Sequence, residues 1–387
     1  MSNMRKITVI SVLLLVVLSV AVALEFSPAG NNCLYKESIS DHYNFNSGLR
    51  YVIIQEGNPY QFLASLTTGD GTDAKYTLLP YQEKDKGNTY VQLKPAITAS
   101  VFRFVFGKDN QFKIEGNLYG YVNLIFAAYS GTDVIAYDGS YLLGGTIAYK
   151  DTVALRVGVR HFSTHLGDEK IVDMYNMPNV TLSGGKTQVT IDGVTYDFID
   201  IVEYVRQNPL TVALSVNIPL SKNISIRAYG EADIPFNGNN TRPFTHTPSD
   251  FDCPYYDNVL SLDWQRDKEG ISDDQYAKEI AIKDGTGYRA LKIHTGLEAT
   301  FDFGPVATVL SGDIQFHEDG KTKHQINGYD KDNPWEIEYS VALAIQLKKP
   351  NKSGGVAIEA KYHNGRFPTP ALFYQRTSYI SVGVSIF

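Results

Sequence analysis

The chain lacks the features of several large protein classes. Only two of its 387 residues are cysteines, which excludes a disulfide-rich scaffold. Basic residues are not in excess, since 35 Lys and Arg stand against 42 Asp and Glu, and this argues against a nucleic-acid binder. Beyond the first residues no apolar run approaches ~18 residues, which excludes helical membrane spans. Aromatic residues are abundant at 12%, with 26 tyrosines, so disorder is excluded as well.

The N-terminus has the three parts of an export signal, predicted over residues 1–23. Arg5 and Lys6 form a positive start, an apolar stretch follows, and a small-x-small triplet at 21–23 offers a cleavage site. A retained anchor helix is the alternative interpretation. Cys33 and Cys253 could form one disulfide in an oxidising compartment. We expect free thiols instead, because the topology derived below places them on opposite sides of a membrane.

From residue 96 onward, segments of about ten residues alternate apolar and polar positions, the pattern of β-strands with two unlike faces. The clearest segment is Trp335–Leu347, whose odd positions are apolar and whose even positions carry Glu336, Glu338 and Gln346. Similar segments occur over residues 112–126, 141–149, 153–163, 210–218, 224–231, 291–303, 306–317 and 356–363.

These strands predict an all-β fold, either a soluble sandwich or a transmembrane antiparallel β-barrel. The export signal and the absence of helical spans favour the barrel. The last strand, with Ile380, Val382, Val384 and Ile386 on one face and a terminal Phe387 out of phase, is similar to the assembly signal of outer-membrane barrels. That similarity implies insertion into the bacterial outer membrane with the barrel assembly machinery and membrane lipid as partners.

Connection lengths alternate between short and long, as expected for periplasmic turns and extracellular loops. Short connections are predicted near 107–110, 150–151, 221–222, 304–305 and 349–354, and long ones near 130–138, 166–208, 233–289, 318–334 and 364–370. The count is about 12 strands, one of them poorly defined before residue 96. Residues 89–387 are therefore assigned to the barrel, and residues 24–88 to a periplasmic arm, a plug or an extra hairpin.

One short motif, at the end of the strand that begins at Val153, could carry chemistry. By parity, His161 and Ser163 extend the apolar face of that strand, whereas Arg156 and Arg160 point into the lumen. Because the strand ascends in the predicted topology, His161 and Ser163 lie at its outer end on the lipid side. They could reach an ester bond in an outer-leaflet lipid.

A serine hydroxyl becomes a good nucleophile when an imidazole removes its proton and a third group orients that imidazole. Ser163 is the candidate nucleophile and His161 the candidate base. Asp168 or Glu169 could supply the orienting carboxylate, and His165 offers a second base or a ligand. The sequence alone does not identify an oxyanion-stabilising group, and it predicts no cofactor.

The motif resembles two enzyme classes, outer-membrane phospholipase A and the outer-membrane lipid A deacylases. Both carry a His-x-Ser on a lipid-facing strand near the outer leaflet, with the His as base, the Ser as nucleophile and a third polar residue as orienter. Both follow the serine with Asn-Gly, where this chain has Thr164-His165. The resemblance implies a lipid or acyl-ester hydrolase.

The run from His161 to Glu169 also resembles the signature of a bacterial family called domain of unknown function 1207 (DUF1207), His-x-Ser-Ser/Thr-His-Leu-Gly-Asp-Glu. The segments 137–160, 210–230, 362–367 and 379–387 are similar to the segments of that family around the motif. The resemblance covers roughly residues 97–387. It implies an exported, outer-membrane protein and supplies no established reaction.

Three alternatives to the hydrolase remain open. His161, His165, Asp168 and Glu169 could form a hydrogen-bonded cluster that clamps the following loop. A metal site could use His161, His165 and Asp168. The protein could also be a non-enzymatic barrel, either a narrow porin-like channel or a structural or surface protein.

Charged residues on the polar faces are expected to line the lumen and pair across strands: Arg103, Arg156, Arg160, Arg227, Lys292, Glu298, Glu336, Glu338, Glu359 and Lys361.

Overall fold

The computed structural model describes residues 23–27, 33–58, 62–68, 75–80, 87–128, 134–166, 180–183, 186–191, 194–196, 200–235, 241–246, 291–317, 335–348, 354–367, 369 and 376–386. Residues 1–22 of the predicted export signal lie outside these ranges. Within the described ranges, no helix has the length and apolarity needed to cross a membrane.

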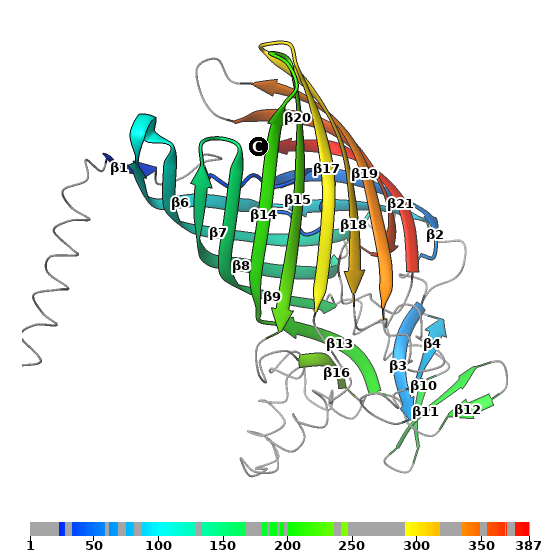
Figure 1. Ribbon diagram of the computed structural model, residues 1–387. Helices are drawn as coiled ribbons and strands as arrows, with labels where there is room; N and C mark the ends of the chain where they lie inside the picture. Colours follow the sequence, from blue (N-terminus) through cyan, green and yellow to red (C-terminus); the bar gives the residue numbers. More distant parts are fainter. Residues whose placement is uncertain are drawn as a thin grey trace, which may run out of the picture.

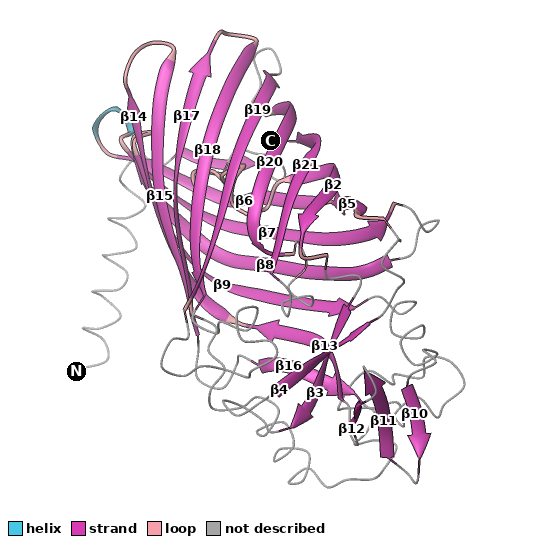
Figure 2. Cartoon of the chain, turned by 90° about the vertical axis from the view of Figure 1, so that its right-hand side faces the viewer, coloured by secondary structure: helices cyan, strands magenta, loops and turns pink. Residues whose placement is uncertain are grey.

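The protein is a closed antiparallel barrel of 12 strands (Figures 1 and 2). A bend at Pro95 divides one of these strands into β5 and β6, both of which pair with β7. The wall consists of β2 (Ser47–Glu56), β5 (Thr89–Lys94) with β6 (Ala96–Phe106), β7 (Phe112–Ala127), β8 (Val134–Tyr149), β9 (Val153–Leu166), β14 (Pro209–Pro219), β15 (Ile224–Pro235), β17 (Lys292–Asp302), β18 (Val306–His317), β19 (Glu336–Lys348), β20 (Gly355–Arg366) and β21 (Arg376–Ile386).

Strand β2 closes the ring. It pairs with β21 from Ser47↔Ile386 onward, and on its other side it pairs with β5. The predicted all-β barrel and its strand number are therefore confirmed. The wall includes β2 and so begins before residue 89, where the sequence suggested that the barrel starts.

Short turns and long connections lie at opposite ends of the barrel. The turn after β17 is short. Gly304 adopts a φ of 89°, in the left-handed region that favours glycine, and its N–H donates to Asp302 Oδ1 at 2.9 Å. Short connections also join β6 to β7, β8 to β9 and β14 to β15, as predicted. At the other end, the long connections carry further strands: β3 (Phe62–Thr68), β4 (Lys75–Pro80), β10 (Val180–Ser183), β11 (Lys186–Ile191), β12 (Val194–Tyr196), β13 (Asp200–Gln207) and β16 (Thr241–His246).

The two faces of the wall differ as the alternation predicts. Large apolar side chains point outward and are exposed, including Leu143, Ile147, Leu297, Ile345 and Ile358. Polar and charged side chains point inward and are buried. A soluble sandwich would reverse this arrangement, so the exposed apolar band is the surface expected of a barrel surrounded by lipid. The last strand follows the same rule, since its predicted apolar face at residues 380, 382, 384 and 386 is exposed.

Residues 33–46 fill the interior of the barrel, and we call them the lumen segment. The carbonyl of Tyr43 accepts a hydrogen bond from Arg160 on β9 at 2.8 Å, and Ser38 bonds Ser311 on β18 at 2.8 Å. On another side of the ring, His42 Nδ1 lies 3.0 Å from the hydroxyl of Tyr379 on β21. A segment that contacts inward-facing residues all around the wall must lie inside it. The strand β1 (Ala23–Ser27), which precedes it, pairs with β6.

Candidate functional site

The predicted site lies at one end of β9, on the outward face. The apolar side chains of Leu155, Val157 and Val159 are exposed, whereas Arg156 and Arg160, which have the opposite parity, are buried. Residues 161 and 163 continue the outward parity, and both side chains are partly buried. His161 and Ser163 therefore lie on the lipid-facing side at the end of β9 that leads into a long connection, which is the placement expected from the sequence.

Two side chains from neighbouring strands flank His161. On β8, Tyr141 is the register partner of His161, and the two rings stack with centroids 4.9 Å apart at an interplanar angle of 22°. On the other side, the pairs Gln207↔Phe162 and Leu210↔Val159 place Asn208 directly opposite His161. His161 Nδ1 lies 2.6 Å from Asn208 Oδ1.

This contact determines the tautomer of the imidazole. An amide oxygen can only accept a hydrogen bond, so Nδ1 of His161 carries the hydrogen and donates it to Asn208 Oδ1. In the neutral ring the lone pair is then on Nε2. His161 thus presents a basic nitrogen while its other nitrogen is held by a neutral side chain. The same relation orients the base in serine hydrolases.

Ser163 lies next to His161 on the same face. Residues i and i+2 of a strand are about 7 Å apart at Cα, a distance that side chains of this size can bridge. The register partner of Ser163 on β8 is Gly139, and a Cβ built at Gly139 would lie 3.5 Å from Ser163 Oγ. The absence of a side chain at residue 139 therefore leaves the serine hydroxyl uncovered on that side.

Among the described side chains, Ser163 Oγ makes no hydrogen bond, so the contact between Ser163 and His161 is not formed in this structure. Active-site hydrogen bonds often tighten only when substrate binds. His165 belongs to β9, where it pairs with Tyr137 of β8, but its side chain is outside the described part. Asp168 and Glu169 also lie outside the described residues, so their proposed role stays a prediction.

Asn208 was not among the residues predicted from the sequence. A signal for it exists, because it has the same parity as Leu210 and Val212 on the outward face of β14, where a carboxamide is unusual. Its partner, however, is 47 positions away. Only the register between β9 and the segment that leads into β14 identifies the pair.

The lumen forms a second polar region, built from charges that pair with one another. Arg156 forms ion pairs with Glu37 of the lumen segment and with Glu231 of β15, the latter at 2.5 Å. Arg103 pairs with Glu115 at 2.7 Å, and Lys292 pairs with Asp233 at 3.0 Å. The predicted lumen lining by ion pairs is confirmed for further members of the set: Arg50 with Glu359, Arg227 with Glu298, and Glu338 with His317, His363 and Arg366.

Cys33, at the start of the lumen segment, is a free thiol. Burial raises the pKa of this thiol to about 11, so it stays protonated and unreactive at neutral pH. The other cysteine, Cys253, lies outside the described residues.

Comparison with known proteins assigns the chain to no family. No protein-family model matches the chain, and no curated protein matches it. Among solved structures, the outer membrane phospholipase A of Escherichia coli is similar over 92% of this chain and 96% of that chain, with 8% identity and a TM-score of 0.41. The transport unit of the E. coli autotransporter AIDA-I is similar over 92% and 94%, with 13% identity and a TM-score of 0.35. The outer membrane channel DcaP of Acinetobacter baumannii is similar over 88% and 96%, with 12% identity and a TM-score of 0.30.

Proposed function

We propose that this protein is a bacterial outer-membrane barrel that hydrolyses acyl-ester bonds of lipids in the outer leaflet. Ser163 is the nucleophile, His161 is the base, and Asn208 orients the imidazole. The observation that carries the proposal is the 2.6 Å contact between His161 Nδ1 and Asn208 Oδ1 on the outward face, beside Ser163. Asp168, Glu169 and His165 remain candidates for supporting roles in the loop that follows.

The location of the site supports a lipid substrate. Polar side chains on a lipid-facing surface cost free energy, and those that are present are usually functional. Here His161 is surrounded by exposed Leu143, Val159 and Tyr141, so a lipid chain can lie against the wall while its ester reaches the polar groups. Tyr137 and Tyr141 at the same end of β8 are suited to the membrane interface, where lipid esters are found.

The reaction proceeds in two steps by the familiar chemistry of serine hydrolases. His161 Nε2 takes the proton of Ser163 Oγ as this oxygen forms a bond to the ester carbonyl carbon. The bond from that carbon to the alcohol oxygen then breaks, and Nε2 gives its proton to the departing alcohol. In the second step His161 Nε2 takes a proton from a water molecule, whose oxygen attacks the acyl carbon. The bond from that carbon to Ser163 Oγ breaks, Oγ takes the proton from Nε2, and the fatty acid is released. Throughout, the bond from Nδ1 to Asn208 fixes the ring.

Localisation to the outer membrane rests on the predicted export signal, the exposed apolar band and the apolar face of the last strand. The barrel assembly machinery and outer-membrane lipid are the partners this implies. The similarity of residues 161–169 to the DUF1207 signature is consistent with such a protein and adds no reaction.

The test is lipid analysis by mass spectrometry. The native chain and a Ser163→Ala variant are each reconstituted in phospholipid–detergent micelles, with Ser215→Ala as the matched control. Ser215 is on the adjacent strand β14 but is buried in the lumen. We expect lysophospholipid and free fatty acid from the native chain and the control, and a loss of at least about 10³-fold in Ser163→Ala. Equal product from Ser163→Ala and the native chain would overturn the proposal.

The alternative is a barrel without enzymatic activity, in which the bond from His161 to Asn208 clamps β9 to the start of β14. In that case no variant releases fatty acid above the protein-free blank, and His161→Ala lowers only the stability of the barrel. Heat-modifiable gel mobility, which separates folded from unfolded barrels, must show that each variant is inserted before activities are compared. The lumen segment argues against an open channel, because it occupies the space that a pore would need.

A further inference from the structure

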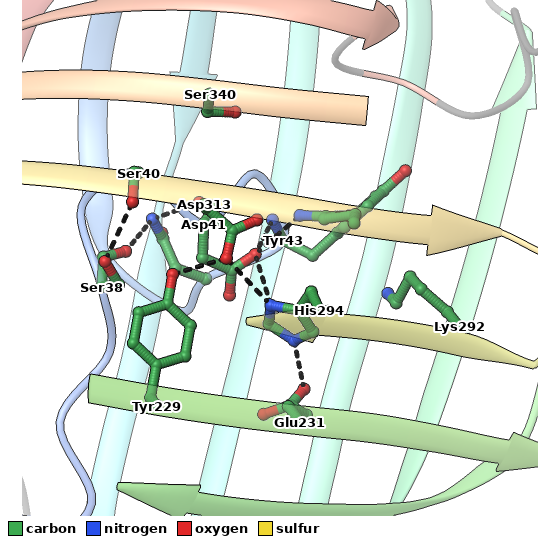
Figure 3. Close-up of polar contacts among 12 residues, drawn as sticks. Ser38, Ser40, Asp41, Tyr43, Tyr229, Glu231, Lys292, His294, Asp313 and Ser340 are labelled. Carbon is green, nitrogen blue, oxygen red and sulfur yellow. Dashed lines mark hydrogen bonds and ion pairs between the residues drawn. The ribbon is translucent and has the colours of Figure 1, made fainter. Parts of the chain in front are cut away.

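A group of buried side chains in the lumen converges on one point, where the lumen segment meets β17 and β18 (Figure 3). Asp41, His294 and Asp313 each offer one donor atom, and these atoms lie within 4.8 Å of one another. His294 Nδ1 is 3.3 Å from Asp313 Oδ2 and 3.9 Å from Asp41 Oδ1. For comparison, two ligand atoms of a tetrahedral zinc site are about 3.4 Å apart, since bonds of about 2.1 Å meet there at tetrahedral angles.

We propose that these residues bind a divalent transition-metal ion of the zinc type, which fastens the lumen segment to the barrel wall. Asp41 comes from the lumen segment, while His294 and Asp313 come from β17 and β18. This site is independent of the outward-facing Ser163 and His161.

The charges around the two aspartates favour a cation. Both carboxylates are buried, and burial of a charge is costly unless it is paired. Of the described basic side chains, only His294 comes within 4.0 Å of Asp41 or Asp313. Even as an imidazolium, His294 would leave one negative charge without a close partner, whereas a divalent ion would balance both.

The contacts of His294 would let a metal ion take the place of the proton that Nδ1 shares with Asp313 Oδ2 at 3.3 Å. Its other nitrogen, Nε2, lies 3.3 Å from Glu231 Oε1, and Glu231 is in turn paired with Arg156 at 2.5 Å. Without the metal, Nδ1 hydrogen-bonds Asp313 and Nε2 has no hydrogen-bond partner among the described residues. If the ring proton moves to Nε2, beside Glu231, the lone pair is left on Nδ1, facing two carboxylate oxygens. Metal-bound histidines are commonly held in this way by a carboxylate behind the ring. Tyr229 adds a similar support, since its hydroxyl donates to Asp313 Oδ2 at 2.5 Å.

Unpartnered atoms at the same place supply a second observation. Among the described residues, Asp313 Oδ1 and Gln315 Oε1 are buried without a hydrogen-bond partner. The amide nitrogen of Gln315 lies 3.3 Å from Asp41 Oδ1, so this amide adjoins the cluster. Rotation of the amide would turn Oε1 toward the donor atoms and make Gln315 the fourth ligand.

The donor set selects the metal. One imidazole nitrogen with two carboxylates and an amide oxygen suits zinc, which binds four N and O ligands. Calcium binds six to eight oxygen ligands, so a site with a histidine nitrogen does not suit it.

The test uses the full mature chain without an affinity tag, refolded from urea into detergent micelles with equimolar Zn²⁺. After dialysis against a weak chelator, zinc is counted by plasma mass spectrometry. We expect about one zinc per native chain, and a loss of about 10-fold or more in Asp41→Asn and His294→Gln. The matched control is Asp233→Asn, which removes another buried lumen carboxylate, one that pairs with Lys292 at 3.0 Å.

The zinc absorption edge of the native protein gives a reading that does not depend on any variant. We expect nitrogen and oxygen neighbours at about 2.0–2.2 Å and no sulfur. A native chain that retains less than about a tenth of an equivalent overturns the proposal, as does a sulfur ligand in the spectrum. Equal loss of zinc from Asp233→Asn and Asp41→Asn also overturns it, because the donor set would then have no special role.

Discussion

The outward site and the lumen both place polar side chains where water is scarce, but they satisfy them differently. In the lumen, Arg156 and Glu231 belong to a network in which each charge has two or three partners. On the outward face, the side chain of His161 has one hydrogen-bonded neighbour and that of Ser163 has none among the described side chains. The dense pairing in the lumen is suited to holding the barrel together, whereas the sparse pairing of His161 and Ser163 is what the proposed hydrolase requires.

The same contrast appears in the backbone partners. Within the lumen, the charged residues of β9 point toward the lumen segment. This segment has no regular secondary structure, and Arg156 and Arg160 bind it through Glu37 and the carbonyl of Tyr43. On the outside, Tyr141, His161 and Asn208 come from three adjacent strands whose register alone brings them together. A change on the outside should then alter activity with little effect on stability, and a change inside should do the reverse.

The largest effect expected is the loss of activity in His161→Ala. Without the imidazole, Ser163 has no base, and serine hydrolases that lose this group fall by about 10⁴-fold or more. Leu155→Ala, six residues earlier on the same exposed face, is the matched control and should retain activity. Hydrolysis is measured in mixed micelles with barrels that show folded mobility on gels. Residual activity within tenfold of the native chain would mean that His161 is not the base.

The next largest effect is the loss of stability in Arg156→Met. This change leaves the carboxylates of Glu37 and Glu231 buried without their shared partner, which costs about 3–5 kcal/mol. Val157→Ala, the adjacent residue on the outward face, removes only two methyl groups from a lipid-facing position and should cost about 1–2 kcal/mol. Urea unfolding in micelles measures both. Equal losses in the free energy of unfolding would contradict the proposed difference between the inward and outward faces.

Much of the fold could be predicted from the sequence, because the alternation of side chains is a local property. The outward parity of Leu155, Val157 and Val159 extends directly to His161 and Ser163, and the structure has the same faces. Connection lengths likewise predict which ends of the strands carry short turns. Both kinds of inference need only neighbouring residues.

What could not be predicted depends on contacts between distant residues. Asn208 becomes a neighbour of His161 only through the register between β9 and β14, across a connection longer than thirty residues of the sequence. The lumen segment has no periodic pattern, and Asp41 meets His294 and Asp313 from more than 250 positions away. A sequence without periodicity gives no face to assign, so three interpretations of residues 24–88 stay open from the sequence alone.

A smaller effect separates the roles of the two outward neighbours of His161. Asn208→Ala removes the hydrogen bond that fixes the ring, and a bond worth about 1–3 kcal/mol corresponds to a loss of about 5- to 150-fold. Because Asn208 positions the base and does not touch the ester, the loss should fall on kcat and leave KM nearly unchanged. Asn208→Asp keeps an accepting oxygen at the same place and should restore most of the activity. A loss in KM alone, or no rescue by Asp, would assign Asn208 to lipid binding instead.

The smallest effect concerns Tyr141, on the other side of the imidazole. Its ring stacks on His161 with centroids 4.9 Å apart, and such contacts contribute about 0.5–1.5 kcal/mol. Tyr141→Phe keeps the stack and should leave kcat unchanged, whereas Tyr141→Ala should lower it about 2- to 10-fold. Tyr141→Leu shows whether Tyr141 acts through ring stacking or only through its volume, because leucine restores much of the volume without a flat ring. If Leu behaves as Phe does, the side chain only excludes lipid from the imidazole. If Leu behaves as Ala does, the flat ring and the bond to Asn208 hold His161 from opposite sides, which is how a lipid-facing base stays fixed without the charges that fill the lumen.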